Sequence, residues 1–195
     1  MFKDQRFYHF RITIILLILF LISFVLAHLI QDSHLFGFTN SDGVKENLSF
    51  NSSNVLGLFG LTLFTSFFIH FNLSHFLQNI IFFGWFGVLT EKKLGRVNFL
   101  LLILSTHVIT LLLMAVFIKG NHYFLGSSLG AVSLFSYYTY INKKWGLLAA
   151  GISVLILYPL LIGSDKFSIY SHGVSILIGL LISFSTQKFR RFKKS

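Results

Sequence analysis

Long apolar runs, separated by short polar segments, dominate the pattern of hydrophobic and polar positions along the chain. Six of these runs are close to the length that an α-helix needs to cross about 30 Å of hydrocarbon. They cover residues 12–30, 73–89, 97–118, 126–141, 145–162 and 169–186. The pattern therefore predicts an all-α, polytopic membrane protein built as a bundle of six transmembrane helices.

The only long connection between these runs is residues 31–72, which starts polar and turns apolar from Val55 to Ile69. We expect a partly inserted outer loop with short interfacial helices, because a seventh crossing would disrupt the charge pattern described next. The chain is then one transmembrane domain, residues 1–195. It has an N-terminal segment 1–11, a six-helix core 12–186 and a basic tail 187–195.

The distribution of basic residues predicts which side of the membrane each connection occupies. Charged residues make up 11% of the chain, against about a quarter in soluble domains, and the net charge is +10. Thirteen of the 16 Lys and Arg residues fall on one side if six spans alternate, and only Lys45, Lys119 and Lys166 fall on the other. This asymmetry predicts cytoplasmic termini, in a plasma or inner membrane, and explains the charge without nucleic-acid binding.

Polar side chains occur where the second, fourth and sixth runs begin, and these runs would all cross from outside to inside. The residues are His75, Ser128 in the segment Gly126-Ser127-Ser128, and His172. Each lies within about the first turn of its predicted helix, so all three are expected at one depth below the outer surface. Asn79 follows His75 by one turn on the same helical face.

Small residues around these positions suggest how the helices approach one another. Gly126 and Gly130 flank Ser128, and Ser175, Gly179 and Ser183 follow His172 at four-residue spacing. Such stripes allow close helix packing in lipid. If the fourth and sixth runs pack through these faces, the Ser128 hydroxyl comes within hydrogen-bond reach of His172, as a base-activated serine nucleophile requires.

Structural explanations exist for each of these residues taken singly. Glycines in membrane helices usually serve packing, and a serine often bonds to its own helix backbone. We interpret His107, in the middle of the third run, as a partnered structural group, and His70 as a structural hydrogen-bonding residue. Taken together, the polar groups favour a catalytic interpretation, because polar side chains in hydrocarbon are costly and are functional candidates by default.

Residue types that are missing or misplaced narrow the chemistry. The chain has no Cys, and none of its six acidic residues lies in the middle of an apolar run. This excludes a cysteine nucleophile and a paired-aspartate protease, and the lack of a His-Glu-x-x-His motif makes a zinc protease improbable. We expect no metal and no cofactor. We expect Asp165 to be solvated.

A small transporter stays open as an alternative function, although transporters usually carry a carboxylate in mid-membrane.

Four motifs resemble those of the rhomboid family of intramembrane serine proteases. His70, His75 and Asn79 resemble its His-x4-His-x3-Asn, and Gly126-Ser127-Ser128 resembles its Gly-x-Ser. His172 with Gly179 resembles its span-six motif, and Gly87-Glu91-Gly95 resembles its Gly-x-x-x-Glu-x-x-x-Gly. The resemblance covers about residues 62–186, in the family's order and spacing.

The resemblance implies Ser128 and His172 as the catalytic dyad and His75 and Asn79 as donors to the oxyanion. It implies supporting roles for His70, Gly126, Gly130, Gly179 and Glu91. The expected partners are the transmembrane segments of substrate proteins and the lipid bilayer. The sequence does not predict an oligomeric state.

The chain also departs from the family pattern. Leu129 follows the nucleophile where the family usually has Gly, and this leaves Ser127 as a second candidate nucleophile. Leu61-Thr62 stands in place of the family's Trp-Arg pair, and Val132 in place of a Tyr. The alternative function is therefore a catalytically inactive rhomboid-like protein that binds membrane segments.

Overall fold

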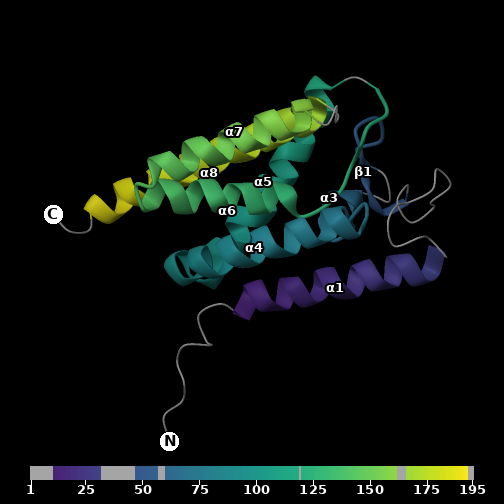
Figure 1. Ribbon diagram of the computed structural model, residues 1–195, viewed down its shortest axis with the longest axis horizontal. Coiled ribbons are helices and arrows are strands. Elements are labelled where there is room, and N and C mark those ends of the chain that lie inside the picture. Colours follow the sequence, from purple (N-terminus) through teal and green to yellow (C-terminus); the bar gives the residue numbers. More distant parts are fainter. Residues whose placement is uncertain (1–10, 32–46, 57–59, 119, 162–165, 193–195) are drawn as a thin grey trace, which may run out of the picture.

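The computed structural model describes residues 11–31, 47–56, 60–118, 120–161 and 166–192. Seven helices and two short strands follow one another along these residues (Figure 1). Their order is α1 (Arg11–Gln31), β1 (Phe50–Asn51), α3 (Thr62–Thr65), α4 (Leu73–Leu94), α5 (Arg96–Phe117), β2 (Tyr123–Phe124), α6 (Ser128–Ile141), α7 (Trp145–Leu161) and α8 (Lys166–Phe192). The predicted all-α bundle is confirmed, and each of the six apolar runs overlaps one helix of at least 14 residues.

Among the described residues, four helices are long and apolar enough to cross a membrane: α1, α4, α5 and α8. The helix α7 contains a shorter apolar stretch, Trp145–Leu155. The helix α6 has 14 residues, about 21 Å at 1.5 Å per residue, and therefore falls short of the full hydrocarbon thickness. Six crossings and cytoplasmic termini stay predictions.

The helix α6 lies at the centre of the bundle and is buried along most of its length. It packs against α4, α5, α7 and α8, while α1 packs on α4 at the edge (Figure 1). All residues from Leu129 to Tyr137 are buried. By contrast, α1 exposes Ile15, Ile18 and Leu21 to about half of their surface. An apolar helix can expose such a face at no cost in lipid.

Close contact between α6 and α8 depends on Gly179. A Cβ atom at this position would lie 2.1 Å from Ser136 Oγ and 2.6 Å from the Ser133 carbonyl oxygen. Further along α8, Ser183 Oγ donates to the Tyr137 carbonyl at 3.4 Å. The predicted packing role of the α8 stripe is thus confirmed for Gly179 and Ser183.

The prediction that Gly126 and Gly130 form the matching surface of α6 is wrong. A Cβ atom at Gly130 would meet Phe67 at 3.1 Å and Ile103 at 3.5 Å, so Gly130 faces α5 and the segment after α3. Gly126 precedes α6 and faces His75. The face of α6 toward α8 is instead formed by Ser133 and Ser136. These hydroxyls donate to backbone carbonyls of their own helix at 2.8 and 3.0 Å, which removes their cost in an apolar interface.

Two short strands join residues 47–56 to the segment that enters α6, a contact the sequence pattern did not predict. Phe50 pairs with Phe124 and Asn51 with Tyr123 in an antiparallel arrangement. Ser52 extends this contact, because its N–H donates to the His122 carbonyl at 3.0 Å. The short helix α3 agrees with the expectation of short helices in this loop.

Glu91, near the end of α4, holds the first turn of α1. Its carboxylate accepts hydrogen bonds from the backbone N–H groups of Ile12 at 3.0 Å and Thr13 at 2.8 Å. The Thr13 hydroxyl donates to it at 2.7 Å. Free N–H groups at a helix start favour a negative charge, so the buried carboxylate is well compensated there. The supporting role predicted for Glu91 would then be to join α4 to the start of α1.

Candidate active site

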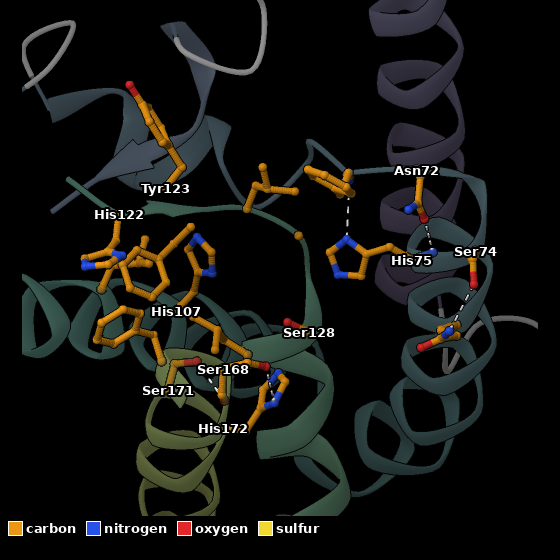
Figure 2. A pocket seen from close by; sticks show the side chains of 18 residues that line it. Asn72, Ser74, His75, His107, His122, Tyr123, Ser128, Ser168, Ser171 and His172 are labelled. Carbon is orange, nitrogen blue, oxygen red and sulfur yellow. Dashed lines mark hydrogen bonds between the residues drawn. The ribbon is translucent and has the colours of Figure 1, made fainter. Parts of the chain in front are cut away.

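A cavity of about 710 Å³ opens where α4, α6 and α8 begin. Ser128, His75 and His172, predicted from the sequence to meet at one depth, all line it. In the close view, Ser128 lies between His75 and His172 (Figure 2). The structure therefore brings together the predicted nucleophile, its predicted base and one predicted oxyanion donor.

The start of α6 decides which of two adjacent serines reaches the cavity. The helix begins at Ser128, which lines the cavity. Ser127 precedes it as the N-cap residue, is fully buried, and its Oγ lies 3.4 Å from His70 Nε2. This geometry favours Ser128 over Ser127 as the candidate nucleophile.

Gly126 sets the turn before these serines. Its φ of +101° is in the left-handed region, which side chains other than glycine rarely adopt. Its N–H donates to the Ser66 carbonyl at 2.8 Å. A Cβ atom here would lie 2.7 Å from His75 Cε1. Glycine is therefore needed both for the backbone conformation and for the close approach of the Ser128 turn to His75.

The imidazole of His75 is oriented by a backbone hydrogen bond. The Phe71 N–H donates to His75 Nδ1 at 3.3 Å, so a neutral ring carries its proton on Nε2. The Nε2–H group is then available as a donor within the cavity. Asn72 caps α4 by accepting from the His75 N–H at 2.8 Å, which fixes the backbone that carries this ring.

Asn79 lies one turn deeper and is 4% exposed. Its Nδ2 donates to the His75 carbonyl at 2.8 Å and lies 3.7 Å from the position of a Cβ on Gly126. An amide nitrogen carries two hydrogens, so one of them is left over beside the Gly126 turn. Unlike His75, Asn79 stands behind the residues that line the cavity.

His172 reaches the cavity from α8, and its nearest polar partner is on its own helix. Its Nδ1 lies 3.4 Å from Ser168 Oγ, one turn earlier. Within the described part of the chain, no direct hydrogen bond joins His172 to Ser128. The Ser–His hydrogen bond predicted from the sequence is therefore not formed in the structure, although both side chains line the same cavity.

His70 supports the site from the segment between α3 and α4. Its Nδ1 contacts the Phe68 carbonyl at 3.1 Å, and its ring packs edge-on against Phe20 and Phe76 at 5.6 and 5.5 Å. Burial, and then the neighbouring His75, lower the pKa of His70 to about 3, against the opposing effect of the Phe68 carbonyl. The ring is therefore neutral at physiological pH, as a structural hydrogen-bonding group requires.

Two further histidines line the cavity, and sequence reasoning assigned neither of them to the site. His107 lines it from α5, and its Nε2 lies 3.1 Å from Ser66 Oγ, which agrees with a partnered structural group. His122 lines it from the segment before β2, and its ring is tilted by 55° against the ring of Phe167, with 3.9 Å between the centroids. Their wide spacing along the sequence gave no signal. In the part of the chain that the structure describes, no group of three His, Cys, Asp or Glu residues is placed to hold a metal ion.

The motif residues all fall within one region that matches a known family. The family model described as Rhomboid domain matches residues 60–189, which is 130 of the 195 residues. The chain belongs to the rhomboid family. The curated proteins, in contrast, contain no match. Rhomboid family membership and the apolar helices together make the chain an integral membrane protein in a family of intramembrane proteases.

Proposed function

We propose that this rhomboid protein is a serine endopeptidase that cleaves transmembrane segments of other membrane proteins. The proposal depends on one observation: Ser128, the first residue of α6, and His172 of α8 line the same cavity. Family membership supports the reaction class, and the position of Ser128 supports its role as the nucleophile.

In the proposed reaction, the Ser128 oxygen attacks the carbonyl carbon of a peptide bond. The proton of the hydroxyl passes to Nε2 of His172, which acts as general base. The same imidazolium then gives this proton to the leaving amine, and the C–N bond breaks to leave an acyl-enzyme. A water molecule, deprotonated in turn by His172, hydrolyses the ester and restores the Ser128 hydroxyl.

The negative charge that develops on the carbonyl oxygen needs hydrogen-bond donors. The first N–H groups of α6 have no intrahelical acceptor, and no side chain caps them. Nε2–H of His75 and the second hydrogen of Asn79 Nδ2 are further candidate donors. These groups are neutral before reaction, so an apolar protein holds them at low cost, and one such donor lowers a barrier by about 3–4 kcal/mol.

The location of the cavity favours a membrane-embedded substrate. Its lining includes Tyr123 and Phe124 of β2, which pairs with β1, and β1 lies at the end of the bundle where α4 begins (Figure 1). With both termini in the cytoplasm, as proposed, this end lies toward the outer face, where water can enter. A substrate helix has to unwind locally there, because a serine cannot reach a carbonyl already bonded within a helix.

A second candidate function is an inactive rhomboid-like protein that binds membrane segments without cleaving them. The observation in its favour is Leu129, which lines the cavity directly beside Ser128. Its side chain is 5% exposed and packs with Phe50 and Leu111. An apolar side chain at this point removes space and polarity next to the candidate nucleophile.

The test compares purified parent, Ser128→Ala, Ser127→Ala and His172→Ala proteins on a tagged transmembrane reporter and with a fluorophosphonate probe. Ser128→Ala and His172→Ala should lose at least about 10³-fold in cleavage rate, since both members of the dyad act in one step. Ser127→Ala should stay within a few-fold of the parent. Binding of the reporter without cleavage or labelling by the parent supports the inactive protein. Equal cleavage by parent and Ser128→Ala refutes the proposed mechanism.

A further inference from the structure

The candidate base, His172, has a neutral partner. The only acidic residue in the described segments is Glu91, whose carboxylate is bound to the start of α1. In a base-activated serine site, the second ring nitrogen of the histidine usually needs an acceptor that fixes its tautomer. The group that lies nearest to this nitrogen here is the hydroxyl of Ser168.

Ser168 stands one helical turn before His172, so the two side chains share a face of α8. Ser168 Oγ and His172 Nδ1 are 3.4 Å apart, and both residues line the cavity. If Nδ1–H donates to this oxygen, the lone pair of the neutral ring is on Nε2, the atom that must accept the Ser128 proton. The reverse tautomer would present an N–H to Ser128 and could not act as its base.

The backbone around Ser168 is held by further hydroxyl groups. Ser171 Oγ donates to the Ser168 carbonyl at 3.1 Å, and Ser175 Oγ donates to the Ser171 carbonyl at 3.0 Å. Ser175 Oγ also lies 3.3 Å from Thr110 Oγ1 on α5. These contacts occupy Ser171 and Ser175, which leaves Ser168 as the hydroxyl directed at the imidazole (Figure 2).

We propose that Ser168 is a positioning residue for His172: its hydroxyl oxygen accepts Nδ1–H and thereby selects the tautomer and ring orientation that leave Nε2 free to act as the base. The inference rests on the proposed protease function. A hydroxyl suits this location, because an ionised carboxylate would be expensive to bury among apolar helices. The same bond persists when His172 takes the Ser128 proton, since Nδ1 keeps its hydrogen in the imidazolium.

The experiment uses the full chain in proteoliposomes and four variants: Ser168→Ala, Ser168→Thr, Ser168→Val and Ser185→Ala. Thr and Val have nearly the same shape and differ in the hydroxyl. Ser185 is an exposed residue of α8 whose hydroxyl donates to the Leu181 carbonyl at 3.0 Å, so it is a matched control. The measured quantities are kcat and KM for cleavage of a transmembrane reporter.

Removal of the acceptor should lower kcat by about 10- to 100-fold in the Ala and Val variants, the range seen when a metal-bound histidine loses its orienting partner. KM should change by less than about twofold, and Ser168→Thr and Ser185→Ala should stay close to the parent. Equal kcat values for the Thr and Val variants, or a parental kcat for Ser168→Ala, overturn the inference. If Ser168→Ala does not fold, the Thr and Val pair decides.

Nitrogen NMR of ¹⁵N-histidine-labelled protein tests the tautomer without any substrate. The His172 signal is assigned by its loss in His172→Gln. A neutral His172 protonated on Nδ1 in the parent and in Ser168→Thr, and a mixture of tautomers in Ser168→Val, support the inference; protonation on Nε2 in the parent overturns it. A parent protein that does not cleave the reporter refutes the protease function itself, whereas an active parent, an inactive Ser128→Ala and an unaffected Ser168→Val refute only the role of Ser168.

Discussion

The two ends of α4 carry two buried polar centres that are organised in opposite ways. At its beginning, His75 and Asn79 stand beside the cavity with Ser128 and His172. Near its end, about 24 Å away at 1.5 Å per residue, Glu91 binds the first turn of α1. Both centres lie in an apolar bundle, so the difference between them shows what each is organised to do.

The Glu91 centre is saturated, and the cavity centre is not. The Glu91 carboxylate accepts three hydrogen bonds of 2.7–3.0 Å. In the cavity, the side-chain contacts of His75 and His172 are 3.3 and 3.4 Å, and no described residue hydrogen-bonds the Ser128 hydroxyl. Saturated polar groups stabilise a fold, whereas groups with unused hydrogen-bonding capacity can bind a reacting carbonyl.

Substitution of Asn79 tests the cavity centre. Asn79→Ala should lower kcat for reporter cleavage by about 10²–10³-fold if its second amide hydrogen stabilises the oxyanion, with thermal stability little changed. Asn98→Ala is the matched control, because Asn98 of α5 is exposed and donates to a carbonyl four residues earlier, Leu94, at 3.1 Å. A parental kcat for Asn79→Ala would assign the oxyanion to the α6 N–H groups and His75 alone.

Substitution of Glu91 tests the opposite end. Glu91→Ala leaves the N–H groups of Ile12 and Thr13 without their acceptor, so we expect a loss of about 2 kcal/mol in the free energy of unfolding. Glu91→Gln should lose less, since its amide keeps one acceptor oxygen. The measurement is thermal unfolding in detergent together with kcat per folded molecule. A fall in kcat at unchanged stability would contradict the division between the two centres.

Acidification should lower the free energy of unfolding, because His70 is buried between α3 and α4 in its neutral form. Burial lowers the pKa of His70 to about 3 in the folded protein, against about 6.5 in an unfolded chain. Between these two pH values the unfolded state binds one more proton than the folded state. The contribution of neutral His70 to the free energy of unfolding is therefore complete above pH 6.5. Below pH 6.5 this contribution is lost by up to about 1.4 kcal/mol per pH unit.

The control for this effect is His70→Gln, which keeps hydrogen-bonding atoms but cannot titrate. Unfolding of both proteins is followed from pH 7.5 to pH 5.0. The variant should show the smaller drop in stability on acidification. Parallel curves for the two proteins would mean that His70 is solvated or already charged in the folded state.

The helices could be predicted from the sequence because an apolar run in lipid has few alternatives to a helix. The helix α6 begins two residues later than the sequence predicts, because Gly126 and Ser127 form a turn before it and their small side chains do not mark the boundary. The pairing of β1 with β2 was missed because two-residue strands leave no periodic signal. Such contacts depend on which distant segments meet, and local patterns do not contain that information.

The sequence predicts which residues form the candidate site, but not which contacts they make. Helix depth alone brought Ser128, His75 and His172 to one cavity. The partner of His172, Ser168, follows from helical spacing and could have been found by looking four residues back. The neighbours of Gly130 could not be predicted, because a glycine has no side chain whose polarity or size would indicate which helix it packs against.

Gly126 also has a consequence for how this protein can vary. Its backbone conformation and its distance from the His75 ring both strain any residue that carries a Cβ atom. In a saturation library selected for function, we therefore expect glycine to be retained at position 126, even where neighbouring positions accept several residues. Variation in the shape of the cavity therefore has to come from its other walls.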